Sequence, residues 1–153
     1  MFNDLREFIK EAEDLGQVKV IEGADWNVEI GTITELSQCK SDQPLLLFDK
    51  IKGYPPGYRI AANPMTSYNR LALCLGLPLN LRGIEQVRAY REKIRDYKPV
   101  PPVYVETGPV KENVTVGEDI DLFKFPAPQW HEYDGGRYIG TGCSVIQKDP
   151  DSG

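Results

Sequence analysis

Residues 134–142 include the side chains and glycines best suited to hold a ligand. Gly140 and Gly142 are two positions apart, so on an extended strand they share one face while Thr141 occupies the other. A strand face without side chains allows a flat ring, or another backbone, to approach closely. The same pattern also fits tight strand packing or a bulge, and both interpretations stay open. These glycines do not form the G-x-G-x-x-G pattern that opens a helix, so we predict no phosphate-binding loop.

A single histidine, His131, restricts the hydrolytic chemistry that this sequence could support. A Ser-His-Asp triad, or a zinc site with several imidazoles, would depend on that one residue. We expect His131 to be a structural hydrogen-bonding residue. It ends a rigid, proline-containing segment, residues 123–131, that we expect to pack Trp130 onto a core.

The other potential metal ligands are not spaced for a metal site. Cys39, Cys74 and Cys143 are far apart, so neither a disulfide framework nor a metal-binding pair is predicted. Cys143 lies in an apolar alternation without a neighbouring cation, which favours a buried, unreactive thiol. The carboxylates between Glu118 and Asp121 flank a turn but lack the spacing of a calcium loop. We therefore expect a solvated turn there.

Residues 1–98 alternate between helical and strand patterns. Apolar residues recur at helical spacing in four segments, residues 3–15, 27–40, 66–75 and 83–97. Strand patterns occupy residues 18–21, 45–48 and 59–62. Interleaved elements of this kind predict a layered α/β domain over residues 1–98. Expected N-caps are Asn3 or Asp4 and Thr66 or Ser67, with Gly16 and Gly76 as stops.

The helical pattern ends at residues 99–111, a proline-rich linker or domain edge. Residues 112–153 are predicted to begin an all-β domain. Extended segments are expected at residues 103–107, 114–116, 122–125 and 138–147. A domain with this few strands cannot close a sheet, and we therefore expect it to be incomplete. Residues 149–153 are typical of a hairpin turn awaiting its second strand, which favours a truncated chain over a naturally frayed terminus.

Composition excludes several classes of protein. The chain has 153 residues, of which 41% are hydrophobic, and a net charge of −5, which fits a soluble globular protein. Acidic residues interrupt the densest basic stretch, residues 82–98, so we expect a solvated helix face and no nucleic-acid or anionic-membrane partner. No apolar run has the length of a membrane span, and the N-terminus lacks the apolar core of a signal peptide. A cytoplasmic location is expected.

Eight motifs, in their order along the chain, resemble the UbiD family. They are DLREFI (4–9), GQV (16–18), EIGTI (29–33), VETGPV (105–110), GEDIDL (117–122), FPAPQWH (125–131), DGGRYI (134–139) and DPDSG (149–153). The resemblance covers essentially the whole chain, and the order of the motifs is specific.

The resemblance implies an N-terminal α/β domain, a central split β-barrel like that of flavin reductases, and a C-terminal domain that helps the enzyme to oligomerise. This chain would supply the first domain and the opening strands of the second. UbiD enzymes use prenylated FMN with a divalent metal, usually Mn²⁺, and often K⁺, and they reversibly decarboxylate aromatic, heteroaromatic or α,β-unsaturated acids. The implied partners are the remainder of the same polypeptide, a small aromatic carboxylic acid and, in the complete protein, further copies of itself.

Few of the family's functional residues can be carried over to this chain. Its asparagine, histidine and glutamate metal ligands, and its Glu-Arg-Glu catalytic network, would lie beyond residue 153, so we expect no catalytic residue and no metal ligand here. Thr141 matches a family threonine on a strand that lines the flavin pocket. Gly140, Gly142 and Cys143 are its neighbours and further cofactor-binding candidates. Arg137 matches a basic position of undefined role.

Three functions follow from these observations. The first is an enzyme fragment, inactive alone, whose α/β domain acts as lid and wall beside the active site of the full protein. The alternative is a non-catalytic binding or scaffold subunit that pairs with a separate catalytic chain. A stop codon after residue 153 would favour the alternative, whereas a reading frame that continues would favour the fragment. A third possibility is part of an ordinary FMN-dependent reductase, which a titration with FMN and reduced nicotinamide would test.

Overall fold

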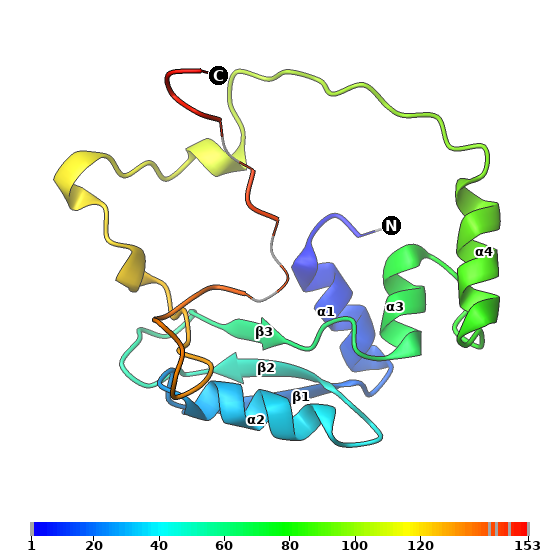
Figure 1. Cartoon of the computed structure of the whole chain (residues 1–153), viewed down its shortest axis with the longest axis horizontal. Helices are drawn as coiled ribbons and strands as arrows, with labels where there is room; N and C mark the ends of the chain where they lie inside the picture. Colours follow the sequence, from blue (N-terminus) through cyan, green and yellow to red (C-terminus); the bar gives the residue numbers. More distant parts are fainter. Residues whose placement is uncertain (1, 141, 143, 147, 153) are drawn as a thin grey trace.

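A three-stranded mixed sheet organises the first half of the chain. The computed structural model describes residues 2–140, 142, 144–146 and 148–152. Its strands β1 (Val18–Glu22), β2 (Leu45–Asp49) and β3 (Ile60–Ala62) are arranged in the order β1-β2-β3. β1 pairs with β2 in parallel, and β3 pairs with β2 antiparallel. The parallel pair requires a crossover connection, which helix α2 (Glu29–Gln38) provides (Figure 1).

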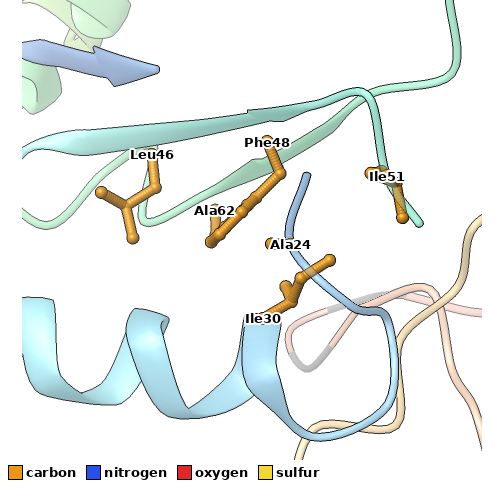
Figure 2. Packing of buried hydrophobic residues seen from close by; sticks show 6 residues of the cluster. All are labelled: Ala24, Ile30, Leu46, Phe48, Ile51 and Ala62. Atoms are coloured by element: carbon orange, nitrogen blue, oxygen red, sulfur yellow. The ribbon is translucent and has the colours of Figure 1, made fainter. Parts of the chain in front are cut away.

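β2 is the centre of the core because its two faces pack against different helices. Leu46 and Phe48 point toward α2, where they meet Ile30 (Figure 2). Leu45 and Leu47 point to the opposite face and pack with Phe8 of helix α1 (Leu5–Asp14). A strand covered on both faces must be apolar at every position, which explains its unbroken run of leucine and phenylalanine. The predicted layered α/β arrangement is therefore present.

The remaining helices are α3 (Tyr68–Leu75) and α4 (Ile84–Ile94). The predicted caps are confirmed at Asp4, whose carboxylate accepts from the backbone of Arg6 and Glu7, and at Ser67, whose hydroxyl accepts from the backbone of Arg70. Gly76 ends α3 with a left-handed φ of 60°, as its position predicted. α4 ends at Ile94 and does not continue to residue 97 as expected.

Arg70 of α3 is completely buried and ties the loops around β3 together. Its guanidinium donates to the carbonyls of Pro64 (2.9 Å), Gln43 (2.6 Å) and Asn63 (3.1 Å) and to the side-chain oxygen of Gln17 (3.1 Å). Burial lowers the pKa of Arg70 because removal from water disfavours the charged form. The many acceptors offset that cost.

The predicted strands after residue 102 are wrong for the part of the chain that the structure describes. Residues 103–107 and 114–116 are irregular, and residues 122–125 are largely a 3₁₀ turn, η3 (Leu122–Lys124). Two further 3₁₀ turns occur at η1 (Pro109–Lys111) and η2 (Gly117–Asp119). Described residues between 138 and 146 form no strand either. Strands need a pairing partner, and Tyr104, which is 93% exposed, has no neighbouring chain to pair with here. The split β-barrel is thus not observed.

Residues 95–125 run in a wide arc away from the sheet before the chain returns beside α2 (Figure 1). Asp149 closes the predicted turn near the C-terminus, since its carboxylate accepts from the backbone of Asp151 (2.9 Å) and Ser152 (2.7 Å). The domain limits predicted at residues 98 and 111 stay predictions. Across the residues that the structure describes, no helix is long and apolar enough to cross a bilayer.

Candidate functional site

A cavity of about 780 Å³ opens between α2, the end of β3 and the returning segment, which contributes residues from 130–140 together with Gly142. It is larger than the depressions of about 510 Å³ beside α4 and about 550 Å³ beside α1. Its lining combines apolar and polar groups, contributed by Gly31, Thr34, Glu35, Gln38, Ala61, Ala62, Asn63, Pro64, Met65, Trp130, His131, Ile139, Gly140 and Gly142. Three stretches that are distant in sequence therefore meet at one site.

Gly140 and Gly142 both line this cavity, although the described residues around them form no strand. A Cβ atom placed on Gly142 would meet no atom within 4 Å, so the space before this backbone is open. Such a bare backbone wall fits a flat ring system, because no side chain keeps the ring away. The other two predicted cofactor-binding residues, Thr141 and Cys143, lie outside the described residues, and the assignment of all four stays a prediction.

Three uncharged polar residues form the opposite wall. The side-chain amide of Gln38 donates to the side-chain oxygen Oδ1 of Asn63 (2.8 Å), and the side-chain amide of Asn63 donates to the backbone carbonyl of Thr34 (3.3 Å). Asn63 has a left-handed φ of 57°, a conformation that asparagine tolerates better than most residues. This strained turn directs the Asn63 side chain across to α2 and joins the end of β3 to the helix.

His131 lies at the rim between two carboxylates. Its Nε2 is 3.6 Å from Glu35 of α2, and its Nδ1 is 3.7 Å from Asp134. The backbone amide of His131 donates to the Asp134 carboxylate (2.8 Å), and this hydrogen bond is the main reason why the pKa of Asp134 is lowered. The Tyr138 hydroxyl also donates to Asp134 (3.1 Å). Burial, followed by that hydrogen bond, raises the pKa of Tyr138.

The returning segment lies directly on the first turn of α2. The backbone of Val28 donates to the Gln129 carbonyl (2.9 Å), and that of Gln129 donates to the Trp26 carbonyl (3.1 Å). At Gly31 the approach is so close that a Cβ would overlap the carbonyl oxygen of Trp130. Glycine in this helix, which weakens the helical pattern in sequence, is thus explained by a close backbone contact. Trp130 packs against the α2 side of the core, as predicted.

Arg137 fastens the same segment to the α/β domain. Its Nε donates to the carbonyl of Ala127 (2.6 Å), and its Nη2 donates to the hydroxyl of Tyr54. The guanidinium carbon lies 4.0 Å from the ring centroid of Trp26, which is a cation–π stacking distance. We call this group, formed by Arg137, Trp26, Tyr54 and the Ala127 carbonyl, the Arg137 clasp.

Nothing in the described residues gathers three or more histidine, cysteine, aspartate or glutamate side chains into a metal-binding group. The carboxylates of Glu118, Asp119 and Asp121 are exposed in and beside η2, as the solvated-turn interpretation expected. The cavity therefore offers a backbone wall, neutral amides and a charged rim. These groups are suited to holding a flat, polar cofactor.

Two protein-family models match this chain and together span most of it. Residues 9–90 match the 3-octaprenyl-4-hydroxybenzoate carboxy-lyase N-terminal domain. Residues 103–153 match the Rift-related domain of the same carboxy-lyase family.

Curated relatives are decarboxylases of small aromatic acids. The pyrrole-2-carboxylic acid decarboxylase of Pseudomonas aeruginosa is 39% identical over 94% of this chain and 30% of the relative. The phenolic acid decarboxylase of Sedimentibacter hydroxybenzoicus is 36% identical over 99% of this chain and 32% of the relative. The chain thus spans about a third of the length of the relatives it matches.

Solved structures agree with this likeness. The closed form of the Sedimentibacter hydroxybenzoicus vanillic acid decarboxylase superimposes with a TM-score of 0.77 at 33% identity, covering 90% of this chain and 29% of that chain. The UbiD-class enzyme HmfF from Pelotomaculum thermopropionicum, solved in complex with FMN, superimposes with a TM-score of 0.65 at 26% identity. The match covers 87% of this chain and 28% of that chain.

Of the residues that line the cavity, Gly140 and Gly142 were candidates from the sequence, whereas Thr34, Gln38 and Asn63 were not. Gly140 and Gly142 were signalled by their spacing, whereas Thr34 and Gln38 carry no signal beyond their place on a helix. Asn63 stands before a proline, which marks a turn but does not reveal its partner. The contacts of these residues join distant segments, so spacing alone could not identify them.

Proposed function

Because this chain belongs to the UbiD family, we propose that it is the N-terminal part of a decarboxylase that acts reversibly on aromatic or α,β-unsaturated carboxylic acids with prenylated FMN. The observation that carries the proposal is the cavity wall of Gly140 and Gly142, which faces the polar wall on α2 and β3. It is supported by relatives that decarboxylate pyrrole-2-carboxylic and phenolic acids and by a related structure that contains FMN. We further propose that the complete protein is cytoplasmic and homo-oligomeric.

The role we assign to this chain is to hold and enclose the cofactor. Gly140 and Gly142, with Thr141 and Cys143 beside them, would lie against the flavin ring. Trp130 and the amides of Gln38 and Asn63 would form the far side and limit the access of water. Prenylated FMN, when bound, supplies the electron-accepting chemistry that decarboxylation requires. Mn²⁺, K⁺ and the proton-transferring acids would be held by the remainder of the polypeptide.

The test is to compare the full-length natural protein with the 153-residue chain, both produced together with a supply of prenylated FMN. Carbon dioxide release is measured with pyrrole-2-carboxylic acid and a set of phenolic acids. We expect release by the full-length protein and none by the 153-residue chain. Release by the 153-residue chain alone, or none by the full-length protein with any acid, would contradict the proposal.

The alternative, a scaffold subunit that pairs with a separate catalytic chain, gives a different result. In that case the natural reading frame would stop after residue 153, and decarboxylase activity would appear only when a second protein is added. Sequencing the gene beyond this point therefore separates the two functions before any assay.

A further inference from the structure

We propose that Arg137 is a positioning residue for the flavin, because it fixes the backbone that leads to the cavity wall formed by Gly140 and Gly142. The inference rests on the proposed function and assigns a role to a side chain that does not itself line the cavity.

The Arg137 guanidinium makes hydrogen bonds through its edge and a stacking contact through its face. The edge donates to the Ala127 carbonyl and the Tyr54 hydroxyl, and the face stacks on Trp26 at 4.0 Å. A planar group held in this way cannot rotate without losing a contact. Among the described residues Arg137 forms no ion pair, so its contacts serve geometry more than charge neutralisation.

The clasp acts on the next residue through the main chain. The amide of Tyr138 donates to the Pro128 carbonyl (3.1 Å), and the indole Nε1 of Trp130 donates to the Tyr138 carbonyl (2.9 Å). Segments 127–130 and 137–138 are therefore joined side by side. Because Gln129 is in turn hydrogen-bonded to the start of α2, the pair is tied to the domain that forms the opposite wall.

Among the residues that the structure describes after Tyr138, Ile139 and Gly142 show little packing against the rest of the chain. Ile139 is 80% exposed, and no atom lies within 4 Å of a Cβ placed on Gly142. The position of Gly140 and Gly142 therefore depends on where the Arg137 clasp holds the backbone at residues 137 and 138. Loss of the clasp should move the wall relative to α2 and leave the helical core intact.

The experiment measures flavin binding directly, with FMN as the probe and the full-length natural protein. Arg137→Gln should raise the FMN dissociation constant about tenfold, which corresponds to about 1.4 kcal/mol. It should also change the visible circular dichroism of the bound flavin. Hydrogen exchange at amides 138–140 should become faster in the flavin-free protein. Arg137→Lys should recover only part of the affinity, since lysine keeps the charge but not the planar fork.

Two further variants keep the inference testable. Arg88→Gln, which removes an exposed arginine on α4, is the matched control and should leave all three measurements unchanged. Tyr54→Phe removes the hydroxyl that accepts from Arg137 and donates to the Phe123 carbonyl (3.0 Å). It should shift the three measurements in the same direction as Arg137→Gln, by less, and it serves if the arginine variant fails to fold. Unchanged affinity, dichroism and exchange in the folded variants would overturn the inference. A wild-type protein that binds no flavin would instead contradict the proposed function. In that case, unchanged hydrogen exchange at amides 138–140 in Arg137→Gln would still contradict the role of the Arg137 clasp.

Discussion

The guanidinium of Arg137 stacks on the indole of Trp26, at 4.0 Å from the ring centroid, although the two residues belong to opposite ends of the chain. Trp26 precedes α2, and Arg137 precedes the glycine wall. The stacked pair therefore connects the element that forms one side of the cavity with the segment that forms the other.

Replacing Gly31 with alanine should destabilise the protein. The new Cβ would overlap the Trp130 carbonyl, so the returning segment must lift away from α2. Overpacking of this kind costs about 1–3 kcal/mol, which urea unfolding would measure. Gly135→Ala is the matched control, because a Cβ there meets no atom within 4 Å, and its effect should stay within about 0.5 kcal/mol. Equal stability of the two variants would contradict the close contact.

Replacing Arg70 with methionine should cost about 3 kcal/mol in the free energy of unfolding. Methionine fills a similar volume but leaves the carbonyls of Pro64, Gln43 and Asn63 without their donor. The comparison is with Arg88→Met on the exposed side of α4, where a change within about 0.5 kcal/mol is expected. If both substitutions had the same small effect, Arg70 would not be the residue that joins these loops.

Asn63 can be tested with a pair of substitutions that differ only in a methyl group. Both Asn63→Gly and Asn63→Ala remove the hydrogen bonds to Gln38 and Thr34. Only alanine also resists the φ of 57°, so Asn63→Ala should be less stable than Asn63→Gly by about 1 kcal/mol. Thermal or urea unfolding of the two variants measures the difference. A more stable alanine variant would mean that the turn is not left-handed in solution.

Asp134 should contribute stability that depends on pH. Its pKa in the folded protein lies below the ordinary value of 3.8, chiefly because the His131 amide donates to the carboxylate. A lowered folded pKa gives stabilisation that is complete above the unfolded pKa and lost as the pH falls through the folded one. The stability difference between wild type and Asp134→Asn should therefore be constant above about pH 5 and shrink as the pH falls below about 4.

Urea unfolding at a series of pH values provides this measurement. Glu132→Gln, which neutralises an exposed carboxylate two residues away, is the control and should not reproduce the loss below pH 4. A stability difference for Asp134→Asn that does not change between pH 7 and pH 3 would show that the hydrogen bond from His131 contributes nothing.

Sequence patterns predicted the first half of the fold because its signals are local. Asp4 and Ser67 cap helices within their own turns, and the apolar run of β2 is visible without knowledge of its neighbours. The same reasoning failed after residue 102. Val103 and Tyr104 are residue types that favour strands, but a strand forms only where another chain segment can pair with it.

The candidate site was predictable only where chemistry follows from residue type. Two glycines at a spacing of two fit either a ligand surface or tight packing, and the sequence alone does not choose between them. The meeting of Gly31 with Trp130, and of Arg137 with Tyr54, depends on how distant segments return to one another. Such contacts leave no periodic trace in the sequence.

The docking of residues 129–130 on the first turn of α2 also sets an order of events during synthesis on the ribosome. All the helices and strands that form the sheet and its two covering faces are made before Gln129 leaves the ribosome, so that compact unit can form first. Until then, the peptide groups beside Val28 and Gly31 face water. Trp130 would then pack onto a unit that is already folded. The cavity would be among the last features of this chain to form.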